Sequence, residues 1–220
     1  MMLQKAFRLL AVITLALATP VSAADSDTIR ILVLGDSLSA GYGLADPADA
    51  FPAQLERALE AKGHKVDMVP GAISGDTTSG GRSRLEWSLG EKPDAVIVEL
   101  GGNDGLRAVD PKITEGNMDF IVRRIQKDGT PVLIAGMLAP PNLGRDYEGR
   151  FNAVFPKIAK DTGALFYPFF LDGAITVAGM MQGDQIHPNP AGVKVIVARI
   201  LPSVEKLFIQ VKDRRAAAAK

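Results

Sequence analysis

Two histidines, His64 and His187, are the only ones in this chain, and it has no cysteine. Asp184 precedes His187 by three residues, and in a tight loop that spacing lets a carboxylate reach the imidazole. A carboxylate so placed fixes the tautomer of the ring and stabilises the imidazolium that forms when the ring accepts a proton. A purely structural hydrogen bond is the alternative. His64 follows a predicted helix end, so we expect it at the surface.

Ser37 is the candidate partner for such a base. It lies in Gly35-Asp36-Ser37-Leu38-Ser39, immediately after an apolar run. A serine at a turn from strand to helix can present its hydroxyl beside outward-pointing backbone N–H groups, as a nucleophile requires. Turn propensity alone favours the simpler interpretation, in which the serine only caps a helix.

Two further stretches could supply hydrogen-bond donors to a developing negative charge. Gly75, in Ile73-Ser74-Gly75-Asp76-Thr77, could bring a backbone N–H close to a ligand, or could be an ordinary turn glycine. Asn103 follows two glycines and offers a side-chain N–H. Such donors, aimed at the oxygen of a tetrahedral intermediate, form an oxyanion hole. An Asx turn or a helix cap is the alternative for Asn103.

The elements that must position these residues alternate along the chain. Short apolar runs predict five strands, over 29–34, 65–69, 95–100, 132–135 and 164–167. Helical spacing or composition predicts helices near 51–63, over 79–89, 113–127 and 147–160, and from an Asn189 cap and Pro190 onward. This alternation indicates an α/β fold with a parallel sheet covered on both faces. Ligands of such sheets bind beyond the carboxyl ends of the strands, where all the candidate residues fall.

Composition excludes several classes of function. The absence of cysteine rules out disulfides, thiolate metal sites and a cysteine nucleophile. The net charge is zero, so we expect no nucleic-acid partner. Neither a G-x-G-x-x-G in the first loop nor a G-x-x-x-x-G-K-[ST] is present, which argues against a nucleotide-binding module. Asp184 and His187 could hold a metal, but no further histidine and no clear carboxylate cluster completes a site.

The two ends of the chain differ from the segment between them. Residues 1–23 carry Lys5 and Arg8, an apolar stretch and a small-residue end, which predicts a signal peptide cleaved near Ala23 or Ala24. Pro20 makes the apolar stretch too short to span a bilayer. Residues 24–211 are predicted to form one domain, and residues 212–220 a frayed tail. We therefore expect a periplasmic or secreted protein without a stable membrane anchor.

The motifs resemble the sequence blocks of the GDSL, or SGNH, hydrolase family. The first block corresponds to Gly35-Asp36-Ser37-Leu38, the second contains Gly75, the third is Gly101-Gly102-Asn103-Asp104, and the fourth is Asp184-Gln185-Ile186-His187-Pro188. All four occur in order. The stretch Val98-Glu99-Leu100-Gly101-Gly102-Asn103-Asp104-Gly105-Leu106-Arg107 is similar to the bacterial periplasmic thioesterase I / lysophospholipase / arylesterase branch.

This resemblance implies a flavodoxin-like three-layer α/β/α sandwich with a parallel sheet of about five strands. It implies a serine esterase acting on esters and thioesters, with Ser37 as nucleophile, His187 as base and Asp184 as its orienting partner. The oxyanion hole would combine the N–H groups of Ser37 and Gly75 with the Asn103 side chain. It implies no cofactor and no metal. The motifs leave a carbohydrate O-acetyl esterase open, because it uses the same triad.

Three apolar residues near these loops are candidates for an acyl channel: Leu106, Met180 and Met181. Methionine adapts to irregular chains, which suits an acyl group. Simple packing in the core or in the loops is the alternative. The expected partner is a small acyl ester or thioester, and we expect the protein to be a monomer.

Overall fold

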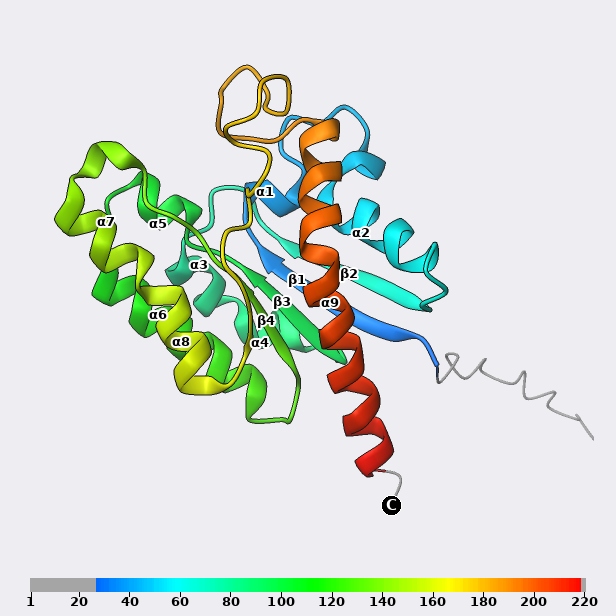
Figure 1. The fold of residues 1–220 in the computed structure, drawn as a ribbon. Coiled ribbons are helices and arrows are strands. Elements are labelled where there is room, and N and C mark those ends of the chain that lie inside the picture. Colours follow the sequence, from blue (N-terminus) through cyan, green and yellow to red (C-terminus); the bar gives the residue numbers. More distant parts are fainter. Residues whose placement is uncertain (1–26, 219–220) are drawn as a thin grey trace, which may run out of the picture.

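The computed structural model describes residues 27–218. Its centre is a five-stranded parallel sheet in the order β2-β1-β3-β4-β5, as Figure 1 shows. The strands are β1 (Ile29–Gly35), β2 (Val66–Ala72), β3 (Ala95–Glu99), β4 (Val132–Ala135) and β5 (Leu165–Tyr167). All five predicted strands are therefore present, each within a few residues of its expected bounds.

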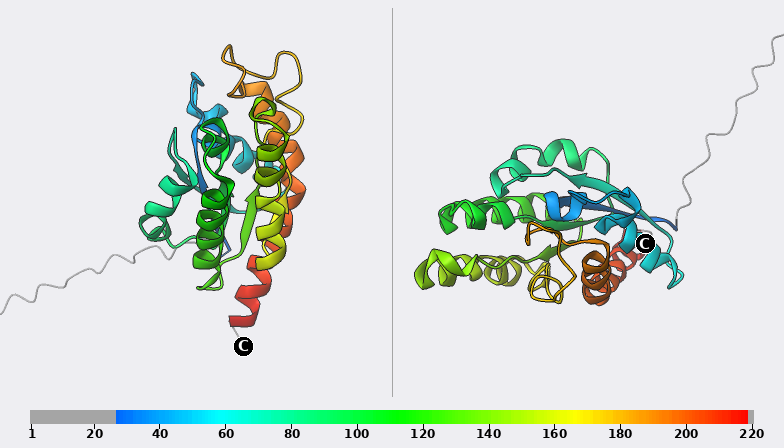
Figure 2. Two further views of the ribbon diagram at one scale, coloured as in Figure 1. Left: turned by 90° about the vertical axis from the view of Figure 1, so that its left-hand side faces the viewer. Right: turned by 90° about the horizontal axis from the view of Figure 1, so that it is seen from above.

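Helices cover both faces of this sheet, which gives three layers. Those along the chain are α1 (Ser37–Ala40), α2 (Phe51–Glu60), α3 (Thr78–Ser83), α4 (Leu85–Leu89), α5 (Gly102–Leu106), α6 (Pro111–Gln126), α7 (Arg145–Asn152), α8 (Val154–Thr162) and α9 (Pro190–Ala218), with short 3₁₀ turns at Pro47–Asp49 and Pro141–Leu143. Seen from above, α2 and α9 lie on one side of the sheet, and α3, α4, α6 and α8 on the other (Figure 2). The predicted α/β/α sandwich is confirmed.

The core forms where these layers meet. Apolar side chains of the inner strands are almost entirely buried, as the run Ala95-Val96-Ile97-Val98 in β3 illustrates. Strands of a sheet covered on both faces must be apolar on both sides, which is why they read as continuous apolar runs in the sequence. Phe51 of α2 packs edge-on against Phe170 near the sheet, with ring centroids 4.9 Å apart. This rigid core fixes the ends of the strands, and therefore the loops that follow them.

Two predicted helices are each divided in two. The predicted helix 79–89 breaks at Arg84, whose guanidinium donates to Gly71 O and Gly35 O and pairs with Asp76 at 2.6 Å. The predicted helix 147–160 breaks at Ala153, three residues before Pro156. Within a continuous helix the proline ring would clash with the carbonyl of the residue four positions earlier, so the break lets Pro156 occupy the first turn of α8.

The last helix is longer than predicted. Asn189 caps it as expected, because its side-chain oxygen accepts from Gly192 N at 3.0 Å. Where a frayed tail was predicted from residue 212, α9 instead continues to Ala218. Alanine has the highest helix propensity, and Arg215 ties this end to the sheet by donating to Thr28 O and pairing with Asp94 at 2.7 Å. The predicted signal peptide lies outside the described residues.

Candidate active site

The carboxyl ends of three neighbouring strands lie side by side at one edge of the sheet. In the strand register Gly35, at the end of β1, is opposite both Ala72 of β2 and Glu99 of β3. The loops that follow these strands carry Ser37, Gly75 and Asn103. The sheet therefore brings to one place three of the stretches that the sequence singled out.

Ser37 is the first residue of α1, a helix of a single turn. Asp36 caps this turn, because its Oδ1 accepts from Leu38 N at 2.9 Å. Gly41 ends it in the left-handed conformation, at φ 79°. The sequence predicts a turn from strand to helix here, and the Asp36 cap places the start of the helix at Ser37.

His187 connects Ser37 to Asp184. Its Nε2 lies 2.9 Å from Ser37 Oγ, and its Nδ1 lies 2.7 Å from Asp184 Oδ2. The other oxygen of Asp184 accepts from the backbone N–H groups of Ile186 and His187, each at 3.0 Å. The hydrogen bond from the His187 side chain and those from the two backbone groups lower the pKa of Asp184 to about 2. The carboxylate is therefore ionised at neutral pH and holds the ring with Nε2 facing the hydroxyl.

The loop between β5 and α9 holds His187 in this position. Gln182 N donates to His187 O at 2.8 Å, and the Gln182 side chain donates to Pro188 O and to Tyr42 O, which lies after α1. Tyr42 also packs on the imidazole, with ring centroids 4.7 Å apart. These contacts join the loop that carries the histidine to the segment that follows Ser37. His64 lies far from here in contact with Phe208, partly buried rather than at the surface as predicted.

Asn103 reaches the Ser37 turn through Asp36. Its Nδ2 donates to Asp36 Oδ2 at 3.1 Å, while the Arg107 guanidinium lies 3.5 Å from its Oδ1 and donates to Gly75 O at 3.1 Å. These two contacts fix which end of the amide is the donor. A primary amide has two N–H groups, so one remains available to a ligand. The structure thus connects Asn103 with both Ser37 and Gly75.

Glycine is required at the turn before α5. Gly101 has φ 114°, a conformation that side chains disfavour, and a Cβ there would lie 2.7 Å from Phe155 Cζ. Gly75 likewise has a positive φ, of 86°. A Cβ at Gly75 would meet nothing nearer than the Arg107 guanidinium at 3.8 Å, so its backbone conformation, and not close packing, favours glycine there.

Sequence reasoning missed a buried polar cluster behind Asn103. Asp104 is fully buried and accepts hydrogen bonds from Thr78 N, Thr78 Oγ1 and Thr114 Oγ1, at 2.8, 2.5 and 3.1 Å. Asn117 adds a further bond to Thr78 Oγ1 at 3.2 Å. Because buried polar groups need partners, this cluster holds α5 against α3 and α6. The pair Thr77-Thr78, in which Thr77 caps α3 and Thr78 begins it, was the available signal.

Two buried carboxyl groups lie directly beneath the Ser37 turn. Asp36 and Glu99 are both at most 1% exposed. Burial raises the pKa of Asp36 to about 6, against the opposing effect of its bonds from Leu38 and Asn103. Burial, followed by the nearby Asp36 charge, holds the pKa of Glu99 well above its usual range. Neither carboxyl group was identified from the sequence.

The comparisons with known proteins agree with this geometry. A sequence profile of the GDSL-like Lipase/Acylhydrolase family matches residues 33–195. This chain belongs to that family. An arylesterase from Vibrio mimicus is 39% identical over 81% of this chain and 89% of its own length. Thioesterase 1/protease 1/lysophospholipase L1 from Escherichia coli K12 is 40% identical over 76% of this chain and 78% of its own.

A solved structure extends the likeness to three dimensions. The psychrotrophic esterase EstA from Pseudoalteromonas sp., inhibited by monoethylphosphonate, superposes with a TM-score of 0.77. It is 32% identical and is covered over 98% of its chain and 81% of this one. The family assignment therefore rests on sequence and fold together, and this GDSL-family protein is a hydrolase of ester bonds.

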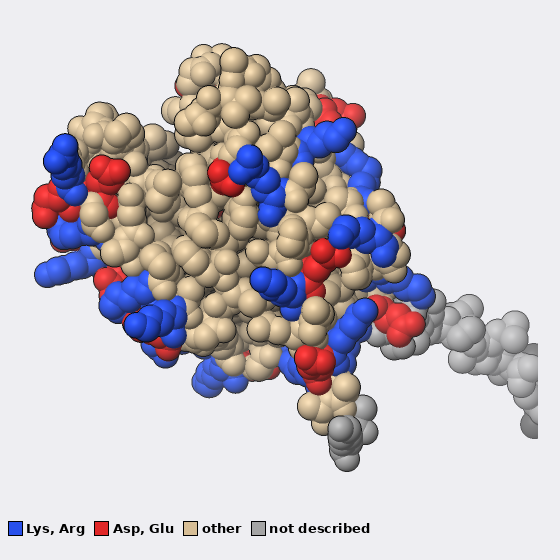
Figure 3. Space-filling model, in the orientation of Figure 1, with Lys and Arg blue, Asp and Glu red and all other residues tan. Residues whose placement is uncertain are grey.

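In this hydrolase, the segment 168–189, which carries His187, contains no lysine or arginine, and its acidic residues are Asp172 and Asp184. The lobe at the top of Figure 3 shows the absence of lysine and arginine as a tan surface. Leu106 is 53% exposed, whereas Met180 and Met181 are partly buried against the core. The three residues predicted to line an acyl channel thus differ in exposure.

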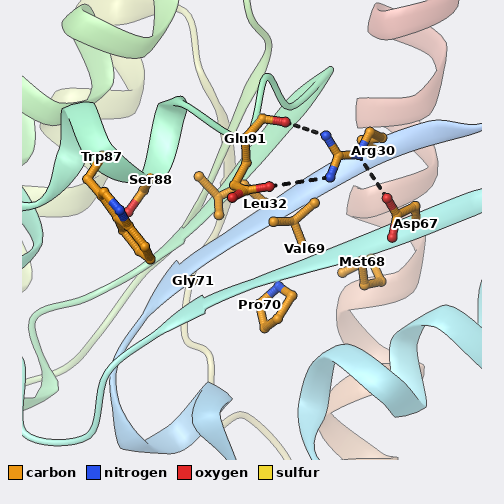
Figure 4. Close-up of a pocket in the computed structure, with 10 residues that line it drawn as sticks. All are labelled: Arg30, Leu32, Asp67, Met68, Val69, Pro70, Gly71, Trp87, Ser88 and Glu91. Atoms are coloured by element: carbon orange, nitrogen blue, oxygen red, sulfur yellow. Dashed lines mark hydrogen bonds and ion pairs between the residues drawn. The ribbon is translucent and has the colours of Figure 1, made fainter.

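A separate surface pocket of about 280 Å³ lies beside the edge strand β2 (Figure 4), and its lining includes none of Ser37, Asp184 and His187. Arg30 pairs there with Asp67 and Glu91, and Trp87 is exposed. Within residues 27–218, no group of three metal-ligating side chains occurs. In the same part of the chain, no helix is both long and apolar enough to cross a membrane.

Proposed function

We propose that this protein is a serine esterase that hydrolyses carboxylic esters and thioesters through an acyl-enzyme on Ser37. The observation that carries the proposal is the continuous chain of contacts from Ser37 Oγ through the His187 ring to the Asp184 carboxylate, at 2.9 and 2.7 Å. In this role His187 is the general base and Asp184 orients it. This arrangement activates a hydroxyl that is otherwise a weak nucleophile at neutral pH.

The proposed reaction has two steps. His187 Nε2 takes the proton of Ser37 as Oγ attacks the carbonyl carbon, and the imidazolium then protonates the departing alcohol or thiol. Water, deprotonated by the same nitrogen, attacks the acyl-enzyme and releases the acid, and the proton returns to Ser37 Oγ. No cofactor or metal takes part.

The proposed oxyanion hole consists of the N–H groups of Ser37 and Gly75 and the side chain of Asn103. Three features support it: the position of Ser37 at a helix N-terminus, the positive φ of Gly75, and the fixed amide of Asn103. Donors held in place before reaction need no reorganisation when the oxyanion forms.

The names of two similar proteins indicate a substrate class. The names arylesterase and thioesterase 1/protease 1/lysophospholipase L1 belong to proteins 39% and 40% identical to this one. The absence of lysine and arginine from residues 168–189 disfavours a strongly anionic polymer as the substrate. We therefore propose aryl, acyl and thioester substrates, with Leu106, Met180 and Met181 in contact with the acyl chain.

Hydrolysis of p-nitrophenyl esters of increasing acyl length tests this substrate class. We expect activity on acyl chains longer than acetyl, and we expect Leu106→Ala and Met180→Ala to change the length profile because they remove apolar contact. The matched control is Ile209→Ala, an exposed residue near the far end of α9. Activity restricted to acetylated sugars would indicate a carbohydrate O-acetyl esterase, and a profile that neither variant changes would remove these residues from the acyl site.

For the compartment, we propose export to the periplasm or the medium after cleavage near Ala23 or Ala24. The support is the sequence of residues 1–23 alone, with its basic start, apolar stretch and small-residue end. N-terminal sequencing of the protein from a periplasmic or culture extract checks it. We expect a start at Ala24 or Asp25, and an intact Met1 in the cytosol would contradict the proposal.

A further inference from the structure

Glu99 lies in an unusual place for a carboxyl group. It is the last residue of β3, fully buried, and opposite Gly35 in the strand register. A Cβ at Gly35 would lie 2.7 Å from Glu99 Oε2, so glycine is needed for the close approach. The mechanism proposed above does not use this group.

Glu99 contacts residues on both sides of Ser37. Its Oε2 accepts from Ser39 Oγ at 2.6 Å and from Asp36 N at 3.3 Å. These partners lie on either side of Ser37 in the sequence. One buried oxygen therefore ties both flanks of the Ser37 turn to the end of the neighbouring strand.

We propose that Glu99 is a positioning residue of the esterase reaction, and that it holds the Ser37 turn as the neutral, protonated acid. The inference rests on the proposed role of Ser37. It goes beyond the triad and the oxyanion hole, because Glu99 contacts neither substrate nor reacting atoms. Its action is on the turn that supplies both the nucleophilic oxygen and a backbone N–H.

The hydrogen bonds favour protonation of Glu99 rather than of Asp36. Asp36 accepts from donors at both oxygens, Leu38 N and Asn103 Nδ2, and His187 lies near enough to stabilise its charge. Glu99 has donors at Oε2 only, and its buried Oε1 has no partner among the described residues. A buried ion without full hydrogen bonding is much costlier than a neutral acid in the same position.

The repulsion between Asp36 and Glu99 also favours a neutral Glu99. Glu99 faces the Asp36 carboxylate, and two adjacent buried carboxyl groups cannot both ionise readily. Asp104 adds a negative charge that raises the pKa of Asp36, but its effect is smaller than those of the Leu38 and Asn103 hydrogen bonds and of His187, which lower it. Arg84 approaches the turn, but it donates to backbone carbonyls and is paired with Asp76. Burial of Glu99 also raises its pKa, which favours the protonated acid.

Kinetics of three variants test the positioning role. Glu99→Gln keeps the shape and the neutral state, so we expect kcat within a few-fold of the parent and an unchanged pH profile. Glu99→Ala removes both hydrogen bonds to Glu99 Oε2, and the milder Ser39→Ala removes one of them. Both variants therefore hold the Ser37 turn less firmly. We expect kcat to fall by about 10- to 100-fold for Glu99→Ala, with KM nearly unchanged, because small misplacements of reacting groups are costly. Glu91→Gln, at an exposed ion pair, is the control.

The outcomes separate this proposal from a purely structural role. A folded Glu99→Ala enzyme with the parental kcat would overturn it, and so would a Glu99→Gln enzyme as slow as Glu99→Ala or with a shifted pH profile. If Glu99→Ala does not fold, Ser39→Ala decides the positioning role: a lower kcat supports it, and the parental kcat overturns it.

Infrared difference spectroscopy tests the neutral state without any substrate. At neutral pH, the parent minus Glu99→Gln spectrum should contain the carbonyl band of a protonated carboxylic acid. A carboxylate band in its place would overturn the proposal. Because this readout does not depend on turnover, it distinguishes a failure here from a failure of the esterase function, which the parent enzyme and Ser37→Ala report.

Discussion

Replacing Ser37 by alanine is expected to lower kcat on p-nitrophenyl esters by about 10⁴- to 10⁶-fold. The variant loses the oxygen that forms the acyl-enzyme, so only unassisted attack by water on the bound ester remains. The fold should be unaffected, because α1 is capped by Asp36 and the Ser37 side chain bonds only to His187 among the described residues. Steady-state kinetics, together with thermal unfolding of both proteins, provides the measurement.

Ser83→Ala is the matched control for this prediction. Ser83 is exposed at the end of α3, and its hydroxyl donates only to Ser79 O within its own helix. Its replacement should leave kcat and KM unchanged. A Ser37→Ala protein that is folded and retains a tenth of the parental kcat would show that the nucleophile lies elsewhere.

The second large effect is expected from Asp184→Asn. The amide has nearly the same shape, but it cannot hold the tautomer with the Nε2 lone pair toward Ser37, nor stabilise an imidazolium. We expect kcat to fall by about 10⁴-fold, the cost of the equivalent change in a serine protease triad. Asp172→Asn is the control, because Asp172 lies in the same segment between β5 and α9 and forms an ion pair with Arg199 of α9. This replacement should leave kcat nearly unchanged.

The pH dependence of kcat in the parent and in Asp184→Asn is a further test. Since the pKa of Asp184 is lowered to about 2, this carboxylate stays ionised as the pH falls from 8 to 5. Protonation of Asp184 is therefore not the cause of any loss of activity in that range. Asp36, whose pKa burial raises to about 6, does take up a proton there. We expect the parent and Asp184→Asn to share the same acid limb, and an acid limb that disappears in the variant would contradict the low pKa of Asp184.

Much of the fold could be predicted because its signals are local. Each predicted strand ends directly before a glycine or a proline, and the Asn189-Pro190 pair marks the start of α9. Of the two breaks, the one at Arg84 was not predicted, whereas Pro156 predicts a disturbance in the middle of helix 147–160, near the observed break at Ala153. The first depends on hydrogen bonds from Arg84 to two distant strands, which helical periodicity does not encode.

The three residues of the proposed triad could be singled out because each follows a strand or precedes a helix whose position was clear. The carboxyl groups behind it were harder. Glu99 interrupts the otherwise apolar run Ala95–Leu100, and a charged residue at that place is the signal for a buried carboxyl group. Asp104 was noted only as part of a family block. Both roles depend on partners 60 and 26 positions away, so the backbone arrangement had to be known first.

Covalent labelling most directly tests the claim that Ser37 is the nucleophile. An organophosphonate ester with a good leaving group should react with the activated hydroxyl, leaving a tetrahedral adduct that resembles the intermediate. Intact mass and peptide mapping should then show one adduct, on the Ser37 peptide, together with loss of esterase activity. No adduct on Ser37→Ala is expected. An inactivated enzyme whose adduct lies on another residue, or an active enzyme with Ser37 fully labelled, would contradict the account.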